Sequence, residues 1–400
     1  MHSRSRIGFP GLTEKGVLAI ALSQFGMTFS LNFILVILPF YILAISPLSH
    51  QATMIWIGLI MASASFTTTL VAPLWGALTA KLSPKSLFEL GMFGTALVIL
   101  SIGFTNNIYL LFVLRLTQGA MSGVSTIGLI LTSALSSQER IRSNLSLYQN
   151  SLTAGQLLGP PAGAYAAKLL GYHSAFFLTF FLILIAIAFC HVNVQNIPAQ
   201  GKAPRTKPAL KKSLLFGWFL CMVASIHLNF MPTILPFITR ATFHMKDPEA
   251  ISAAGIIMMT YTAASIIGSY LLCRISDRVG VERVMVTALL VAGAFQVLLI
   301  GSTGMVSFVI IRMLQGAFVS AVFPLTISVF ARQVGGTMIG FLNAARFFGN
   351  AVGPLLSASI LAFAGLPTVY LFVAGLTFTA LWFFLSSLKR EETRKRSAQS

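Results

Sequence analysis

Charged residues are scarce in this chain. Only 9% of its 400 residues are Asp, Glu, Lys or Arg, whereas 56% are hydrophobic and the mean hydropathy is +0.85. A water-soluble domain carries about 25% charged residues, so the composition excludes a soluble globular fold. The excess of apolar side chains predicts a protein whose solvent is the lipid bilayer.

Acidic residues are the scarcest charged type. The chain has nine Asp and Glu against 27 Lys and Arg, a formal net charge of +18, and none of the nine falls deep within an apolar run. A buried carboxylate is therefore not available as a proton carrier. Clustered acids, histidines or an activated nucleophile are also missing at depth, and no GxxxxGK[ST] loop occurs, so we expect no enzyme and no cofactor.

Cysteine is equally sparse. The three cysteines are Cys190, Cys221 and Cys273, and their spacing shows no pairing. Neither a disulfide framework nor a metal site is expected from them. A signal-peptide cleavage pattern is also absent from the first apolar run, so we expect this run to be retained as a membrane span.

Long apolar runs make up most of the sequence. Each is close to the roughly 20 residues that one helical crossing requires, and their glycine content and length fit helices better than the short alternating strands of a barrel. The sequence predicts an all-α polytopic membrane protein. The twelve runs are 16–42, 52–79, 87–104, 109–135, 144–168, 174–194, 213–239, 251–273, 284–302, 307–332, 338–363 and 368–388.

The basic residues are dispersed over short loops and tails. Nucleic-acid binding would gather them on one face among aromatic residues, so we expect no nucleic-acid partner. The rule that basic loops stay in the cytoplasm accounts for them better. It predicts a multi-pass protein with both termini in the cytoplasm. The short loops and the absence of targeting segments favour the bacterial inner membrane.

One segment of the sequence recurs in similar form in the second half of the chain. The segment LNFILVILPF at 31–40 returns as LNFMPTILPF at 228–237, a shift of 197 residues, and Arg115-Leu-Thr-Gln-Gly returns as Arg312-Met-Leu-Gln-Gly at the same shift. The chain therefore divides into a six-helix half over 1–194, a cytoplasmic linker over 195–212, and a second half with a basic tail over 213–400. Parallel repeats of this kind place a substrate site between the halves, near the bilayer midplane.

Glycines recur every four residues in the fifth apolar run. Gly155, Gly159 and Gly163 of GQLLGPPAG form one smooth stripe, and such stripes let helices approach closely in lipid, while Pro160 is expected to bend the helix. Gly353 and Pro354 repeat the motif in the second half. With Arg115-x-x-Gln-Gly, this motif resembles the major facilitator superfamily over the whole chain, most closely its twelve-helix drug:proton antiporters. The resemblance implies the major facilitator fold, a hinge at the glycine stripe, and proton coupling through Arg115.

A loop motif of the same family appears in altered form. GALTAKLSPK, which runs from Gly76 to Lys85, lacks the acid of the family pattern, while CRISDRVGVER keeps Asp277 and Arg278. In the family this acid latches the cytoplasmic side. The resemblance therefore assigns a gating role to these four residues, with Asp277 taking over the latch by contact with the positive end of the fifth helix.

Three cations lie inside predicted spans. Arg115, Arg312 and Arg346 have no deep carboxylate to pair with, and an unpaired charge at depth is costly. Backbone carbonyls, water or an anionic substrate would satisfy them, since Arg binds carboxylate bidentately. Arg346 is the best candidate for a substrate contact. Arg115 and Arg312 are assigned to coupling, with snorkelling toward the outer end as the structural alternative.

Polar residues share faces with these cations or with the repeated phrase. Arg346 has Asn343 and Asn350 on its face, with Gln149 and Gln156 at the corresponding places in the first half. We also expect several polar and aromatic groups to line the cavity, although helix packing explains each nearly as well. They are Gln24, Asn32, Asn229, Tyr261, Phe33 and Phe230.

His227 is the only histidine predicted to lie deep in a span, and so the one deep group expected to titrate near pH 7. It is two residues from both Ser225 and Asn229, about 200° around a helix, and should face away from their stripe. A coupling role for His227 competes with a packing role.

Together these observations predict a secondary active transporter, expected to be monomeric, that moves a small organic compound by alternating access. Proton-coupled efflux is the main hypothesis. The alternative is transport of an organic anion, such as a polycarboxylate metabolite or a siderophore. A lipid flippase or a non-transporting sensor is a weaker alternative.

Overall fold

The computed structural model describes residues 10–137, 139–199, 212–331 and 336–397. Within these ranges the chain is almost entirely helical and contains no strand. Ten of its helical stretches are long and apolar enough to cross a membrane. Two of the ten, Ser143–Asn193 with 51 residues and Ala344–Ser386 with 43 residues, are each long enough to cross twice.

Both double-length helices break at a single glycine. The long helices are α6 (Ile141–Asn193) and α13 (Gly336–Ser397), and the breaks fall at Gly171 (φ 79°, ψ 170°) and Gly365 (φ 79°, ψ 174°). Only glycine adopts such a conformation without strain. The two breaks are 194 residues apart, the same shift that relates Gly155 to Gly349. With each long helix counted as two crossings, the described ranges contain the twelve predicted spans.

The first half also contains shorter helices with clear local causes. In α3, Ser83 caps the first turn by accepting a hydrogen bond from the Ser86 amide at 3.1 Å, as short polar side chains do at helix N-termini. The span formed by α4 and α5 breaks at Gly123, where Trp75 of α2 inserts and donates to the Ala120 carbonyl at 2.7 Å. The bounds are α1 (Pro10–Ile45), α2 (His50–Leu78), α3 (Pro84–Phe104), α4 (Ile108–Met121) and α5 (Val124–Leu135).

The second half repeats this plan with one more break. Its first span is divided at Phe230 and ends in a short π-helix, because Pro232 and Pro236 cannot continue regular backbone hydrogen bonding. The bounds are α7 (Lys212–Asn229), α8 (Met231–Phe237), η1 (Ile238–Thr242), α9 (Asp247–Val279), α10 (Val281–Leu298), η2 (Leu299–Gly301), α11 (Met305–Val319) and α12 (Val322–Ala331).

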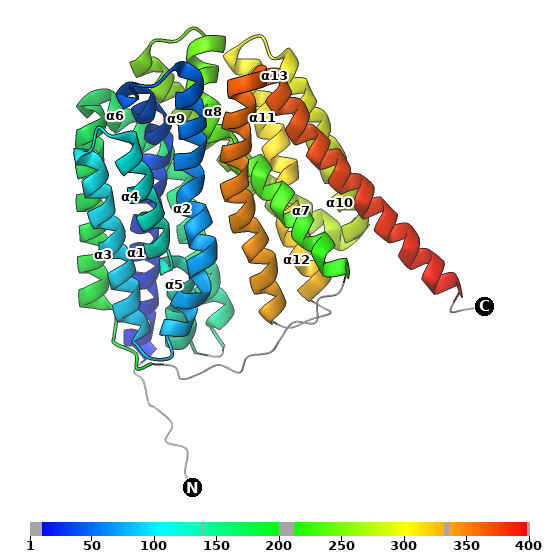
Figure 1. The fold of residues 1–400 in the computed structure, drawn as a ribbon. Coiled ribbons are helices and arrows are strands. Elements are labelled where there is room, and N and C mark those ends of the chain that lie inside the picture. Colours follow the sequence, from blue (N-terminus) through cyan, green and yellow to red (C-terminus); the bar gives the residue numbers. More distant parts are fainter. Residues whose placement is uncertain (1–9, 138, 200–211, 332–335, 398–400) are drawn as a thin grey trace. The chain divides into compact units, whose positions relative to one another are not determined.

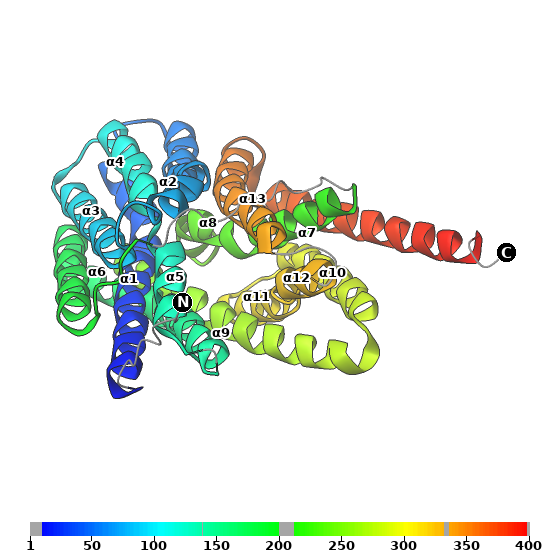
Figure 2. The same cartoon turned by 90° about the horizontal axis from the view of Figure 1, so that it is seen from below.

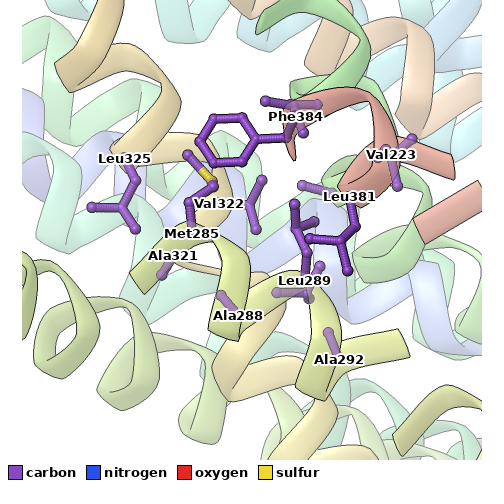
Figure 3. Packing of buried hydrophobic residues seen from close by; sticks show 14 of the residues in the cluster. Val223, Met285, Ala288, Leu289, Ala292, Ala321, Val322, Leu325, Leu381 and Phe384 are labelled. Atoms are coloured by element: carbon purple, nitrogen blue, oxygen red, sulfur yellow. The ribbon is translucent and has the colours of Figure 1, made fainter. Parts of the chain in front are cut away.

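An apolar core joins α7, α10, α12 and the second crossing of α13. Figure 3 shows Val223, Met285, Leu289, Val322 and Phe384 meeting there. Fully burying each such side chain contributes about 1.5–3 kcal/mol, which fixes these helices against one another. In Figures 1 and 2, α11 likewise runs beside α9 in this half, and α3 runs beside α6 in the first.

By contacts, the chain forms two compact units. The first is Met1–Ile37 with Leu70–Pro204, and the second is Leu38–Thr69 with Arg205–Ser400. The division at Pro204 falls within the predicted linker, most of which lies outside the described residues, as does the end of the basic tail. The end of α1 and most of α2 group with the second unit, which the three-part division made from the sequence does not anticipate. Each unit is described by itself below.

Candidate functional site

The glycine stripe of α6 lies against α1, the helix that carries the first copy of the repeated phrase. A Cβ added at Gly155 would lie 2.7 Å from the Phe29 amide nitrogen, and one at Gly163 would lie 2.0 Å from the Phe33 carbonyl oxygen. Between them, Gly159 approaches Asn32 equally closely, at 2.7 Å. The two helices therefore meet backbone to backbone, as small residues permit.

The second half makes the same contact between α13 and the pair α7 and α8. A Cβ at Gly349 would lie 2.5 Å from the Met222 carbonyl oxygen, and one at Gly353 would lie 3.3 Å from Ile226. At the position equivalent to Gly163 stands Ser357, whose hydroxyl donates to the Phe230 carbonyl at 3.3 Å. Pro160 and Pro354 are both buried beside these glycines. The motifs are placed symmetrically, and their gating role stays a prediction.

Gln24 lies buried rather than on an open face of α1. Its Nε2 donates to Thr28 at 3.0 Å, and its Oε1 accepts from the Tyr148 hydroxyl at 2.8 Å. Both ends of the amide are thus satisfied inside the first unit. Tyr148 was not singled out from the sequence, where it stands unmarked among polar residues of the fifth span.

The two asparagines of the repeated phrase are half-buried. Asn32 donates to the Thr28 carbonyl at 2.9 Å, and Asn229 donates to the Ser225 carbonyl at 3.0 Å. Asn229 also donates to Asn350 at 2.8 Å, which joins α7 to α13. The predicted polar stripe therefore exists, but part of its hydrogen-bonding capacity is used between helices.

The other residues predicted to line the cavity differ in how exposed they are. Gln149 is exposed and Gln156 is half-buried, whereas Phe33, Phe230 and Tyr261 are buried. The side chain of Asn343 lies outside the described residues. Of this set, only the two glutamines of the first unit are accessible in the described conformation.

Arg346 is exposed, unlike the other two deep cations. Its guanidinium lies over the ring of Phe323 in α12, 5.4 Å from the ring centroid. Nearby on the same helix, Phe348 packs against Trp218 of α7 with ring centroids 5.4 Å apart. An open cation beside an aromatic surface is suited to an organic ligand that carries negative charge.

Arg312 is fully buried in the second unit and does not snorkel. Its NH1 donates to Gln315 Oε1, and its NH2 donates to the His227 carbonyl at 2.7 Å. The guanidinium lies 4.6 Å from the Tyr261 ring centroid and 5.2 Å from that of Phe230. Among the described residues no carboxylate pairs with it, so carbonyl oxygens and aromatic faces hold this charge.

A chain of hydrogen bonds leads from Arg312 through His227 to α13. Gln315 Nε2 meets His227 Nδ1 at 2.6 Å, His227 Nε2 meets the Thr377 hydroxyl, and Thr377 donates to the Val373 carbonyl at 2.9 Å. A guanidinium can only donate and a carbonyl can only accept, so every link has one direction. His227 Nδ1 must accept and Nε2 must donate, which makes His227 neutral in this arrangement.

Two members of this chain of hydrogen bonds were not anticipated from the sequence. Gln296 of α10 accepts from Gln315 Nε2, and Thr377 accepts from His227. Both are fully buried polar residues within apolar spans. A polar residue at such depth is itself a signal, although the sequence does not say which helices meet.

The first unit keeps the Arg–Gln pair without the histidine. Arg115 donates to Gln118, as Arg312 does to Gln315. The positions equivalent to His227, Gln296 and Thr377 are occupied in the first unit by buried Ser30, Ile99 and Ile183. The extended chain of hydrogen bonds is therefore a property of the second half.

The four residues that the loop motifs assign to gating lie at or near helix ends. Lys85 donates to the His191 carbonyl at 2.8 Å and lies 3.8 Å from Glu89. Gly76 has open space around it, and Asp277 and Arg278 are exposed in the last turn of α9. Within the described residues no three His, Cys, Asp or Glu side chains gather as a metal site would require.

Comparison with known proteins decides the family. The sequence matches the Major Facilitator Superfamily over residues 20–254 and 249–400. The chain belongs to the Major Facilitator Superfamily. The expected fold is confirmed, and this chain is a multi-pass membrane transporter of a small molecule, as other superfamily members are.

Relatives in the superfamily have known names. The Staphyloferrin B transporter of Staphylococcus aureus (strain NCTC 8325 / PS 47) is 26% identical over 383 residues, which cover 91% of this chain and 90% of that protein. The Multidrug resistance protein MdtG of Salmonella paratyphi A (strain ATCC 9150 / SARB42) is 25% identical over 384 residues, 91% of this chain and 93% of that protein.

Solved structures share the fold at low identity. A bacterial homolog to the human lysosomal transporter Spinster, inward-facing and occupied, has a TM-score of 0.78 at 12% identity, over 96% of this chain and 98% of that one. The nucleoside transporter NupG has a TM-score of 0.76 at 17% identity, over 93% and 99%. These likenesses extend over whole chains and support the superfamily fold alone.

Proposed function

We propose that this transporter exports a small organic anion and that Arg346 binds a carboxylate of the substrate. The observation that carries the proposal is the exposed guanidinium of Arg346, set within the first crossing of α13 and beside Phe323. Among the described residues no carboxylate stands against it. An accessible cation at this depth, without a protein counter-ion, is costly unless water or a ligand satisfies it.

The contrast with Arg312 supports the assignment. Arg312 is enclosed by Gln315, the His227 carbonyl and two aromatic rings, so both of its terminal nitrogens already donate inside the protein. Arg346 keeps its planar fork of donors open. A guanidinium fork binds a carboxylate by two parallel hydrogen bonds, which gives both affinity and orientation.

The names of two relatives support the proposed direction and substrate class. One is named for staphyloferrin B, a siderophore, and others for multidrug resistance, which implies movement out of the cell. We therefore favour export of a carboxylate-bearing metabolite or siderophore. The further substrate contacts that we propose are Asn350, Asn229, Gln149, Gln156 and Asn343.

Coupling and topology complete the proposal. We place the chain in the bacterial inner membrane as a monomer, with both termini in the cytoplasm, where the positive-inside rule puts the basic loops. A proton is the proposed coupling ion, with Arg115, Arg312 and His227 as the coupling residues. The 1–194 and 213–400 halves would move about the 195–212 linker, gated at the glycine stripes and at Gly76, Lys85, Asp277 and Arg278.

The test is transport by purified protein in proteoliposomes. Labelled citrate and labelled tetraphenylphosphonium serve as probes, with and without a pH gradient, for wild type, Arg346→Ala and Arg346→Lys. Lys168→Ala, which removes an exposed cation from α6, is the matched control. Citrate transport that Arg346→Ala abolishes and the control retains is the expected result. Tetraphenylphosphonium transport that survives Arg346→Ala, without citrate transport in wild type, would overturn the proposal in favour of cation efflux.

A further inference from the structure

The direction of the hydrogen-bond chain at His227 leaves no place for a second imidazole proton. In the described arrangement Gln315 Nε2–H points at His227 Nδ1 across 2.6 Å. A proton on Nδ1 would set two donors face to face. A buried donor without an acceptor costs about 1–3 kcal/mol, and more when it is charged.

Among the described residues, the side-chain oxygen of Gln315 is the acceptor placed to take a hydrogen bond from that proton. Gln315 can turn its amide so that Oε1 faces His227, but Oε1 is the atom that accepts from Arg312 NH1. Arg312 and a protonated His227 therefore compete for a single oxygen. In the low dielectric of a packed interior their like charges also repel strongly.

No acidic side chain among the described residues contacts His227 or Arg312 to relieve this competition. The titratable or charged side chains packed around His227 and Arg312 are Tyr261 from α9 and Tyr370 from α13, while Gln296 from α10 and Thr377 from α13 are neutral. Among the described residues Arg312 is the one charged group that faces His227. A proton taken up by His227 thus acts directly on Arg312.

We propose that Gln315 is a positioning switch that links proton uptake by His227 to the release of Arg312. With His227 neutral, the amide holds Arg312 through Oε1 and the imidazole through Nε2. When a proton from water binds Nδ1, the amide turns and Oε1 accepts from Nδ1–H. Arg312 NH1 then loses its acceptor, and Gln296 Oε1 loses the donor Gln315 Nε2. No covalent bond other than N–H forms. This deepens the proposed function by naming the group through which a proton acts.

One buried group near Arg312, the Tyr370 hydroxyl, can accept a hydrogen bond from the released guanidinium. Three buried groups have no hydrogen-bond partner, namely Arg312 Nε, Gln296 Nε2 and the Tyr370 hydroxyl. Tyr370 interacts electrostatically with Arg312, and its oxygen can accept a hydrogen bond. Unsatisfied polar groups of this kind are rare in packed interiors and call for an explanation. A second position for Arg312 supplies one.

The first unit is an internal control. Arg115 and Gln118 form the same pair, but Ser30 stands where His227 would be, and its hydroxyl has no hydrogen-bond partner. Ser30 cannot take up a proton near neutral pH, so the Arg115–Gln118 pair should not respond to pH. The switch is accordingly assigned to the second half alone.

The experiment is solid-state NMR of the full-length wild-type protein in lipid bilayers, with ¹⁵N-labelled histidine and arginine, followed from pH 8 to pH 4. The His227 and Arg312 signals are identified by their loss in His227→Gln and Arg312→Lys. At high pH we expect His227 with its proton on Nε2. As Nδ1 gains a proton, the Arg312 guanidinium signals should shift in the same pH step, while those of Arg115 stay constant.

Variants at the two glutamines sharpen the test. In Gln315→Leu the shared acceptor is gone, so the Arg312 signals should no longer move with His227 protonation. Gln118→Leu, the matched change in the first unit, should leave the shared step intact. A proton on Nδ1 in the neutral state, or Arg312 signals that stay constant while His227 titrates in wild type, would overturn the switch. Because no substrate is needed, that outcome is independent of whether citrate transport succeeds.

Discussion

The hydroxyl of Tyr148 donates to the side-chain oxygen of Gln24 at 2.8 Å, and so binds α6 to α1 through a buried polar contact. The equivalent positions of the second half are Leu342 and Cys221, which pack together in an apolar cluster. The equivalent helix contact is thus a polar hydrogen bond in the first half and an apolar contact in the second half. The polar version is directional, whereas the apolar version can slide without losing a specific bond.

Tyr148→Phe tests the polar version. The change leaves Gln24 Oε1 buried without its donor, and we expect a loss of about 1–3 kcal/mol in the free energy of unfolding. Thermal unfolding in detergent, followed by intrinsic fluorescence, measures it. Tyr165→Phe on the exposed face of the same helix is the control. Equal stability of the two variants would show that the hydrogen bond is not structural.

Gly163→Ala tests the close approach of α6 and α1. The new methyl group would lie 2.0 Å from the Phe33 carbonyl oxygen, so one helix must move, at a cost of about 1–3 kcal/mol for overpacking. Gly76→Ala meets nothing within 4 Å and serves as the control. We expect a lower melting temperature for the first variant only. An unchanged melting temperature and transport rate for Gly163→Ala would argue against both packing and hinge roles.

Gly171→Ala and Gly365→Ala test the backbone breaks. No heavy atom comes within 3.9 Å of a Cβ at either site, so the expected cost is purely conformational. A non-glycine residue held at this positive φ costs about 1–3 kcal/mol. Gly375→Ala lies in a regular helical turn with open space and should be neutral or slightly stabilising. Comparable stability of all three variants in a denaturation series would contradict the strain argument.

Arg346→Lys separates charge from geometry at the proposed substrate site. Lysine keeps the positive charge but loses the planar fork that donates two parallel hydrogen bonds to a carboxylate. A lost hydrogen bond to a charged partner is worth about 1.5–3 kcal/mol, so the KM for citrate should rise at least about tenfold with little change in kcat. Concentration-dependent citrate transport measures both. A kcat that falls at constant KM would point to a role after binding.

Hydropathy predicted the spans because the bilayer imposes a length on every crossing. The connections between successive spans were harder to predict. The runs 144–168 and 174–194 were separated by an expected loop, whereas the structure joins them through Gly171 alone. A glycine at positive φ turns the chain within one residue, and nothing in a hydropathy profile marks that event.

The face of His227 also followed from the sequence. Two residues on a helix correspond to about 200°. Accordingly, Asn229 meets Asn350 whereas His227 meets Gln315 and Thr377. The partners themselves could not be predicted, because periodicity assigns a residue to a face of its own helix and not to a neighbouring helix. Gln296, Thr377 and Tyr148 were missed for this reason.

The shortness of several turns between spans has a practical consequence. Within the described residues, successive spans are joined by 46–49, 105–107, Gly171, 243–246, 302–304 and Gly365. Such turns offer a protease or an antibody almost no linear peptide to bind, and the spans themselves would have to accommodate an epitope tag placed at Gly171 or Gly365. Binding reagents raised against these turns should therefore recognise the folded protein and fail on a denatured blot.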